Sequence, residues 1–311
     1  MKRKMISLLM AGVMAMSLAG CGGSKTAETT APSEAPATEA SAAETTAAET
    51  TAAETDATVK QVGTNGGGAL DTSDWKDEDG KFTVGFDQDF PPMGFVGDDG
   101  EYTGFDLELA KEVATRLGLE FVPQPIAWDA KDMELNSGTI DCIWNGFTMN
   151  GREDDYTWSK PYMNNSQVFV VKKDSGISSF ADLAGKVVEV QADSSAEAAL
   201  KDKEDLTSTF KVLQTTPDYN TAFMDLEMGA VDAIAMDVIV AGYQIENRDD
   251  KDDYLILEET LSAEEYGIGF KKGNEAQRDQ VDKTLEEMAA DGTLKTISEK
   301  WFGRDVTTIG K

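Results

Sequence analysis

Small polar residues and an arginine follow a strongly apolar stretch near the middle of the chain. Residues 140–143 are apolar enough to form a buried strand. The polar and small positions that follow are Asn145, Gly146, Thr148 and Arg152. Glycine has no Cβ, so a ligand can approach its backbone closely, and an arginine just beyond a strand binds a carboxylate through two parallel hydrogen bonds. The stretch predicts a carboxylate-binding loop, with a strand end and a surface arginine as the alternative.

Two serines and an aspartate stand at the ends of other predicted elements. Ser194 and Ser195 precede an alanine-rich helix, and either of them can cap it. A helix N-terminus also attracts an anion such as a carboxylate, although capping alone would explain both serines. Asp237 stands at the end of an apolar strand at 231–236, where a simple strand-end cap is one interpretation.

An acid and two aromatic residues follow strands near the start of the ordered chain. The strand 81–86 leads into Asp87 and Phe90, and Trp128 lies on the loop after a strand at 119–122. Because these residues follow strands, we expect them at the edge of the sheet where ligands bind. The alternative for Phe90 and Trp128 is a plain place in the core.

Alternating strands and helices must position these side chains. Strands are expected at 81–86, 119–122, 140–143, 167–172, 187–190, 210–213, 231–236, 254–257 and 266–270. Helices are expected at 105–117, 131–135, 196–200, 219–228, 280–290 and 294–301, with a turn at 97–100. Short links between them predict mainly parallel sheets covered by helices. Ligands bind beyond the carboxyl ends of such strands, so we expect the polar residues to converge there.

The composition excludes several classes of protein. The 311 residues include 58 Asp and Glu against 28 Lys and Arg, and this acidity argues against binding nucleic acid. The chain has no histidine, which excludes Ser-His-Asp catalysis, Cys-His catalysis and histidine-ligated zinc. We expect neither a metal nor a cofactor.

The N-terminus has the pattern of an exported and lipidated protein. Basic residues at 2–4 precede a short apolar segment at 6–19, as in a secretory signal. The sequence Leu-Ala-Gly-Cys at 18–21 resembles a bacterial lipobox, which implies cleavage before Cys21 and lipidation of its thiol; a plain signal peptide is the alternative. Residues 22–70 are rich in Ala, Thr and Glu without aromatic residues, which predicts a flexible stalk.

Several motifs together resemble one family, the polar amino-acid-binding proteins of bacterial ABC importers, of the glutamine-, histidine- and lysine/arginine-binding kind. The motifs are VGFD at 84–87, FPP at 90–92, GFDLELA at 104–110, GTIDCIWNGFT at 138–148, LAGKVV at 183–188, MGAVDA at 228–233 and DGT at 291–293. The resemblance covers about residues 81–302. It implies two lobes joined by two hinge crossovers, the type II arrangement, which close on the ligand.

The resemblance also implies domain limits and residue roles. It divides the chain into a signal peptide at 1–20, a stalk at 21–74, a first lobe at 75–165 plus 263–311 and a second lobe at 166–262. The ligand carboxylate is expected at Arg152, the Asn145–Gly146 backbone, Thr148 and the helix start at Ser194 and Ser195. The ammonium is expected at Asp237, and the side chain between Phe90 and Trp128, with its distal end at Asp87. The loop to Arg152 is one residue shorter than in the family, and Asp193 stands where a glycine is common.

Three functions remain open from the sequence. The first is an extracytoplasmic lipoprotein, held at the outer face of the cell membrane, that delivers an amino acid to ABC permease subunits as a monomer. The second is a dehydratase-like enzyme that uses acid chemistry on arogenate or prephenate in the same cleft. The third is a ligand-sensing module for a separate receptor. An acid at position 87 favours lysine, arginine, histidine or glutamine, with cystine as a further possibility.

Overall fold

The computed structural model describes residues 79–311; the predicted signal peptide, Cys21 and stalk lie outside them. A single ten-stranded sheet runs through the described residues, with a main path in the order β10-β9-β11-β8-β13-β6-β1-β5, while β12 pairs with β8 and β7 with β13. The strands are β1 (Lys81–Phe86), β5 (Glu120–Pro125), β6 (Cys142–Thr148), β7 (Thr157–Trp158), β8 (Met163–Lys172), β9 (Val187–Gln191), β10 (Val212–Thr216), β11 (Ala233–Asp237), β12 (Tyr254–Ile256) and β13 (Ser262–Phe270).

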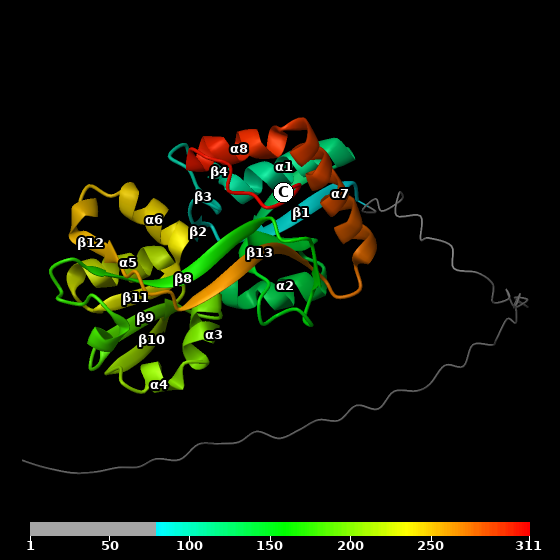
Figure 1. The fold of residues 1–311 in the computed structure, drawn as a ribbon. Helices are drawn as coiled ribbons and strands as arrows, with labels where there is room; N and C mark the ends of the chain where they lie inside the picture. The colour runs from blue at the N-terminus through cyan, green and yellow to red at the C-terminus, as the bar shows by residue number, and fades with distance from the viewer. Residues whose placement is uncertain (1–78) are drawn as a thin grey trace, which may run out of the picture. The chain divides into compact units, whose positions relative to one another are not determined.

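Pairing directions divide this sheet into two lobes. β1 pairs in parallel with β5 and β6 in the first lobe, and β9 pairs in parallel with β10 and β11 in the second. The long strands β8 and β13 lie between these groups and are antiparallel to each other and to their outer neighbours. Figure 1 shows them crossing diagonally from one lobe to the other. The mixed α/β fold with two lobes is therefore confirmed, with β8 and β13 as the connections.

Helices cover both lobes. Those of the first lobe are α1 (Phe105–Leu117), α2 (Lys131–Ser137), α7 (Glu275–Asp291) and α8 (Thr293–Phe302). Those of the second lobe are α3 (Ser195–Lys201), α4 (Glu204–Thr207), α5 (Tyr219–Met228) and α6 (Val238–Glu246). Short 3₁₀ turns lie at Trp128–Ala130, Phe180–Leu183 and Lys251–Asp253, and β2 (Asp89–Phe90), β3 (Gly94–Val96) and β4 (Tyr102–Thr103) form a small separate sheet.

Apolar periodicity and capping explain the best-defined helices. In α1 the side chains of Phe105, Leu109 and Val113 are buried at a spacing of four residues, so one face packs on the sheet. The helix ends at Gly118, whose φ of 73° is the left-handed value that favours glycine at a helix end. α5 begins where the Asp218 carboxylate accepts a 2.7 Å hydrogen bond from the Thr221 amide. These ends agree with the sequence prediction.

Several predicted bounds were wrong or incomplete. β8 begins at Met163 and β13 at Ser262, four residues earlier than expected in each case. β10 occupies Val212–Thr216, two residues further along than expected. α6 was not expected at all: its sequence is apolar on most faces and gives no helical period. The turn at 97–100 does join the hairpin of β3 and β4.

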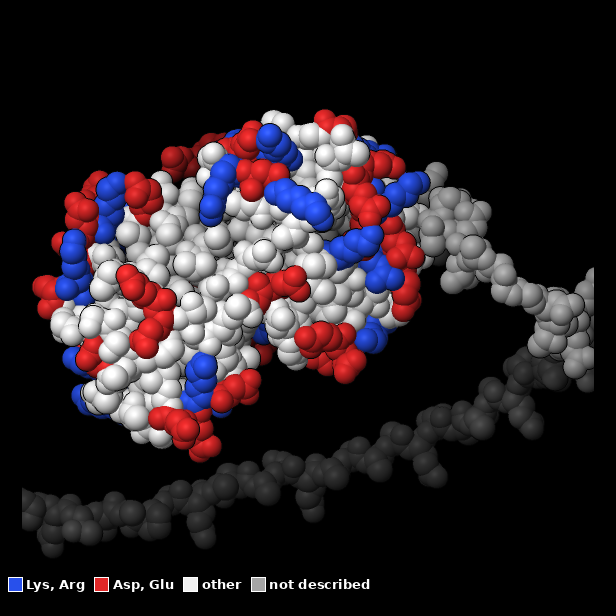
Figure 2. Space-filling view, in the orientation of Figure 1, with Lys and Arg blue, Asp and Glu red and all other residues white. Residues whose placement is uncertain are grey.

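The surface carries interspersed charges. On the face shown in Figure 2, Lys and Arg alternate with Asp and Glu around the rim, and no broad basic patch is present on that face. None of the helices within residues 79–311 has the length and apolar composition needed to cross a membrane.

Candidate functional site

Nine of the ten predicted binding residues line one pocket between the lobes. They are Phe90, Trp128, Asn145, Gly146, Thr148, Arg152, Ser194, Ser195 and Asp237. Gln191, which the sequence analysis did not select, completes the lining. The tenth predicted residue, Asp87, lines an adjoining cavity that shares Trp128 with this pocket. The fold therefore brings together residues that lie up to 147 positions apart, while their role in binding stays a prediction.

The predicted loop at Asn145 and Gly146 is instead part of strand β6, which runs to Thr148, and a buried carboxylate shapes the backbone there. The Gly146 amide donates a 2.6 Å hydrogen bond to Asp106 Oδ2, which also accepts a 2.8 Å bond from the Tyr162 hydroxyl. Gly146 has a φ of 57°, and a Cβ at this position would lie 2.9 Å from Phe90 Cε1. Only glycine fits this backbone without strain. The Asn145 side chain is buried beside it, and neither of its polar atoms has a hydrogen-bond partner among residues 79–311.

The Arg152 guanidinium reaches across the cleft without an acidic partner in residues 79–311. It donates to Thr148 O at 3.3 Å in its own lobe and to Asp193 O at 3.3 Å in the other. Its Cζ lies 5.3 Å from the centre of the Phe147 ring, which holds the group by a cation–π contact. The alternative for Arg152 was a place in a surface ion pair. Within the described residues Arg152 takes part in no ion pair.

Asp237 lies at the junction of the second lobe with β8 and β13. Its Oδ1 accepts hydrogen bonds from Asn165 Nδ2 at 2.6 Å, Gln167 Nε2 at 2.8 Å and the Tyr266 hydroxyl at 2.6 Å. Burial, followed by repulsion from the Glu264 carboxylate, raises the pKa of Asp237 to about 7. Asp237 is therefore much more than a strand-end cap, since it belongs to a buried polar network.

Hydroxyl groups from both lobes meet opposite Asp237. Ser194 caps α3, with its Oγ accepting a 3.1 Å hydrogen bond from the Glu197 amide. The neighbouring Ser195 hydroxyl lies 3.2 Å from the Thr148 hydroxyl of the first lobe, within hydrogen-bond distance. Of the two serines, Ser194 therefore serves the helix, while Ser195 faces the cleft.

The two predicted aromatic residues approach the pocket from the first lobe. The centre of the Phe90 ring lies 6.0 Å from that of Tyr219 in the second lobe. Trp128 packs edge-to-face on Phe147 at 5.4 Å, and the Lys131 ammonium lies 5.2 Å from its ring centre. Both rings thus contribute to the core and to the pocket wall, because each is mostly buried but lines the cavity.

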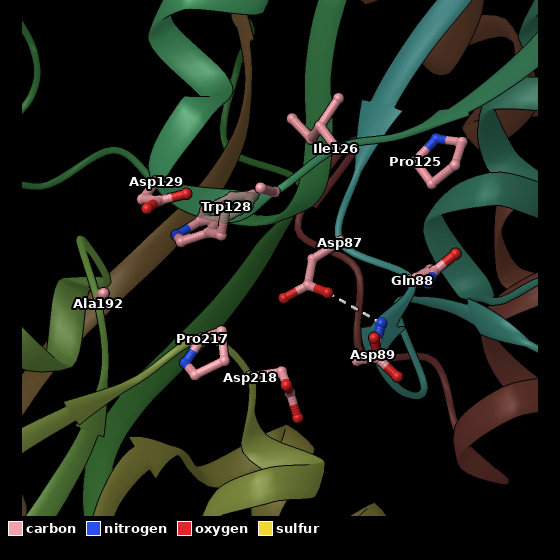
Figure 3. Close-up of a pocket in the computed structure, with 11 residues that line it drawn as sticks. Asp87, Gln88, Asp89, Pro125, Ile126, Trp128, Asp129, Ala192, Pro217 and Asp218 are labelled. Carbon is pink, nitrogen blue, oxygen red and sulfur yellow. Dashed lines mark hydrogen bonds between the residues drawn. The ribbon is translucent and has the colours of Figure 1, made fainter.

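Asp87 points into an adjoining acidic cavity of about 370 Å³, shown in Figure 3. Its lining residues are Asp87, Gln88, Asp89, Pro125, Ile126, Ala127, Trp128, Asp129, Ala192, Pro217 and Asp218. Four of these are acids and none is a lysine or arginine. Burial raises the pKa of Asp87 to about 6, although the Asp89 amide and the Gln191 side chain donate hydrogen bonds to it. The cavity suits a cationic group.

Gln191 separates the two spaces. Its Nε2 donates a 2.6 Å hydrogen bond to Asp87 Oδ2 across the cleft and a 3.0 Å bond to Pro217 O. A ligand whose main-chain groups occupy the pocket would pass this amide to reach the acidic cavity. Gln191 stands at the end of a strand, just before the two serines. This position was the sequence signal by which it could have been selected.

An ion pair also joins the lobes. Lys131 on α2 is only 1% exposed, and its ammonium binds the Asp193 carboxylate, as well as Asp193 O at 3.2 Å. Asp193 has a φ of 57°, a left-handed conformation that aspartate tolerates better than most residues. This explains how an aspartate can stand where the family commonly has glycine.

Polar residues of β8 and β13 were missed by the sequence analysis. Asn165 and Gln167 on β8, and Glu264 and Tyr266 on β13, all surround Asp237. Burial alternates along the first residues of both strands, but the polar residues there are consecutive, as at 164–167, so polarity alone did not mark the inward positions. Within the described part of the chain, no cluster of acidic or cysteine side chains is placed to hold a metal ion.

A polar cleft between two α/β lobes, joined by two strands, defines the type II class of solute-binding proteins. The comparisons with known proteins agree. Residues 82–304 match the model of the bacterial extracellular solute-binding proteins, family 3, and the chain belongs to this family.

Individual relatives cover most of the described residues. The chain is 36% identical over 233 residues to the L-cystine-binding protein TcyJ of Escherichia coli, covering 74% of this chain and 85% of that protein. It is 32% identical over 228 residues to the arginine-binding extracellular protein ArtP of Bacillus subtilis, covering 71% of this chain and 86% of that protein. Among solved structures, an ABC uptake transporter substrate-binding protein from Streptococcus pneumoniae with bound histidine is similar, with a TM-score of 0.72 and 36% identity over 74% of this chain and 95% of that one.

Proposed function

We propose that this protein captures a free polar amino acid between its two lobes, outside the cytoplasm, and delivers it to the permease of an ABC importer. One observation carries the proposal: a cationic group, Arg152, and an acidic group, Asp237, line the same pocket from different lobes. Free amino acids carry one charge of each sign. Membership of an extracellular solute-binding family, and relatives named for amino acids, support the same function.

In the proposed complex the pocket residues bind the main-chain groups. Arg152, the backbone at Asn145 and Gly146, Thr148 and the α3 start at Ser194 and Ser195 hold the carboxylate. Asp237 holds the ammonium, and Phe90 and Trp128 cover the side chain. Arg152 supports this role because its guanidinium engages only carbonyl oxygens and a ring among the described residues, so a carboxylate would be its first acidic partner.

The acidic cavity at Asp87 selects the side chain in this proposal. Four acids and no basic residue favour an amino acid with a positive charge at its far end, such as arginine, lysine or histidine. Cystine is also a candidate, because it carries a second ammonium group and a relative at 36% identity is named for it. Glutamine would bind without the charge attraction.

The proposed lobe limits are 75–165 plus 263–311 for the first lobe and 166–262 for the second. Support comes from β8 and β13, which contain residues 165–167 and 262–264 and pair with each other there. Closure at these strands would seal the ligand, because contacts such as Asp87 with Gln191 join the lobes only when they meet.

A thermal-shift screen of the twenty amino acids and cystine tests the function. A bound amino acid raises the melting temperature in proportion to the logarithm of its concentration above its dissociation constant. Arg152→Ala and Asp237→Ala should each remove the shift, while Arg304→Ala, at an exposed arginine distant from the pocket lining, should keep it. Wild-type affinity in both pocket variants would refute the site.

The enzymatic alternative has one observation in its favour. The raised pKa values of Asp237 and Asp87, about 7 and about 6, are suitable for a general acid. We propose that the protein is a binding protein and not an enzyme, so purified protein should give no phenylpyruvate or phenylalanine from prephenate or arogenate. Turnover that Asp237→Asn abolishes would favour the enzyme.

Anchoring is a separate part of the proposal. We propose that Cys21 carries lipid and holds the protein at the outer face of the cell membrane, on the evidence of the lipobox-like sequence at 18–21. Cys21→Ser should move the protein from the membrane fraction to the medium or periplasm, as measured by fractionation and immunoblotting. Cys142→Ser, at the buried cysteine of β6, is the matched control and should leave the distribution unchanged.

A further inference from the structure

Two buried carboxylates face each other where β13 meets the second lobe. Asn165 Nδ2 donates hydrogen bonds of 2.6 Å to both Asp237 Oδ1 and Glu264 Oε1. These two oxygens are therefore separated by no more than twice that distance. Gln167 Nε2 also bonds to both, at 2.8 Å and 2.6 Å. The two acids share the same pair of neutral amides.

No protein cation balances this pair within the described residues. Asp237 is 3% exposed and Glu264 is 6% exposed, and neither takes part in an ion pair of residues 79–311. Two adjacent buried carboxylates cannot both ionise without a large cost. Either a proton or a cation from outside the protein must therefore reduce their charge.

The pair is accessible from the proposed amino-acid site. Asp237 lines the pocket directly. Glu264 Oε1 accepts a 2.9 Å hydrogen bond from the Thr148 hydroxyl and lies 3.5 Å from the Ser195 hydroxyl, and both hydroxyl-bearing residues line the same pocket. Glu264 also lines a second groove, whose lining includes Arg152 and Ser195 as well.

We propose that Asp237 and Glu264 together balance the ammonium group of the bound amino acid, and that the pair releases a proton when the ammonium enters. This inference rests on the proposed function and adds Glu264 to it as a positioning residue. The ammonium replaces the proton that the pair shares, so the buried site keeps a similar charge before and after binding.

The pKa of Asp237 supports the exchange, since burial and then the Glu264 charge raise it to about 7. The other titratable or charged groups that face the pair are Tyr266 on β13, Tyr219 on α5 and Arg152 beside the pocket. Burial raises the pKa of both tyrosines well above the ordinary value, so neither titrates near neutral pH. An ammonium lowers the pKa of Asp237 and expels its proton, so affinity should rise from pH 5 to pH 7 and then level.

Isothermal titration calorimetry in two buffers with different ionisation enthalpies counts the protons. L-arginine, L-histidine, L-glutamine and L-cystine are the probes, at pH 6 and pH 8. The wild-type protein should release close to one proton per bound amino acid from the pair at pH 6 and a small fraction at pH 8. Glu264→Gln keeps the shape but removes the charge, so its proton release at pH 6 should be smaller than that of the wild type, and it should bind at least tenfold more weakly at pH 8. Glu265→Gln, at the exposed next position, is the control and should behave as wild type.

The outcomes separate this inference from the proposed function. Equal proton release in the wild type and Glu264→Gln would overturn the shared proton, while amino-acid binding itself would stand. Asp87 is the same in both proteins, so its own titration cancels in this comparison. If Glu264→Gln does not fold, binding by the wild type at pH 6 with no proton release would overturn the inference by itself. No binding of any probe by the wild type would overturn both proposals.

Discussion

The Asp106 carboxylate and the Gly146 amide are joined by a hydrogen bond of 2.6 Å, although 40 residues separate them. Asp106 lies in the first turn of α1, and Gly146 lies in the predicted carboxylate-binding loop. The helix thus fixes the left-handed backbone of Gly146. Because this backbone lines the pocket, a residue with no surface exposure controls the geometry of the site.

Asp106→Asn should weaken both the fold and binding. The asparagine oxygen can take the place of Oδ2 and keep both bonds, but the NH₂ group then occupies the buried place of Oδ1, which has no hydrogen-bond partner among residues 79–311, at a cost of about 1–3 kcal/mol. Burial raises the pKa of Asp106 from 3.8 to about 7, so the folded state holds a proton that the unfolded state loses between these values. Its stabilising contribution is therefore greatest below pH 3.8 and is lost as the pH rises through about 7.

The cost of Asp106→Asn should consequently be larger at pH 5 than at pH 8. Urea unfolding of the ligand-free protein at both values measures it. Glu287→Gln, at an exposed position on α7, is the control and should change stability by less than about 0.5 kcal/mol. An equal cost of the Asp106 substitution at both pH values would contradict the buried titration.

Gly146→Ala should abolish amino-acid binding, because the added Cβ would lie 2.9 Å from Phe90 Cε1 in a backbone with φ of 57°. The left-handed conformation alone costs about 1–2 kcal/mol for a residue with a Cβ. Gly100→Ala is a matched control, since Gly100 has φ of 82° but no atom within 4 Å of an added Cβ. Gly100→Ala should lose comparable stability and keep full affinity in calorimetry. Similar affinities for the two variants would show that close packing at Gly146 is unimportant.

Asp87→Asn should reduce selectivity for cationic side chains. Burial raises the pKa of Asp87 to about 6, and a cationic side chain would favour the ionised carboxylate. The ratio of arginine to glutamine affinity should therefore rise as the pH increases from 5 to 7 in the wild type. In Asp87→Asn the ratio should be smaller and nearly independent of pH. Dissociation constants for both amino acids at pH 5.5 and 7.5 provide the measurement, and an unchanged ratio would place the side chain elsewhere.

Lys131→Met should weaken binding without contact with the amino acid. The Lys131 ammonium joins α2 to Asp193 across the cleft, so its loss favours open lobes. Because the Asp193 side chain is half exposed, we expect a modest effect of roughly threefold to tenfold, mainly through faster release. A double-mutant cycle with Asp193→Asn tests the link by stopped-flow kinetics. Fully additive effects would show that the two side chains act separately.

Local sequence patterns could predict the lobes and most of the pocket. Gly118 and Gly229 mark helix ends because only glycine adopts their left-handed backbone easily, and both ends were predicted correctly. Residues 145–152 were expected at the carboxyl edge of parallel strands, and the family resemblance implied that Asp237 would meet Arg152 in the same cleft. The structure does bring them to one pocket.

Other parts depend on pairing that no local pattern records. Glu264 is an ordinary charged residue in sequence, and only the pairing of β13 with β8 brings it to Asp237. Gln191 gains its importance from Asp87, 104 positions earlier. Asp87 lines a separate cavity because of how closely the two lobes approach. Residue types alone do not specify this approach.

The position of β13 has a consequence for biosynthesis. This strand, at 262–270, fills the place between β6 and β8, which end at residues 148 and 172 and are therefore made well before it. The sheet of the nascent polypeptide therefore has a gap at its centre until the last sixth of the chain emerges. Two unpaired strand edges would remain exposed during that interval, and such edges promote aggregation. A chaperone that delays compaction until translocation is complete would therefore protect this chain. A chain whose domains are each built from consecutive residues would benefit less from such a chaperone.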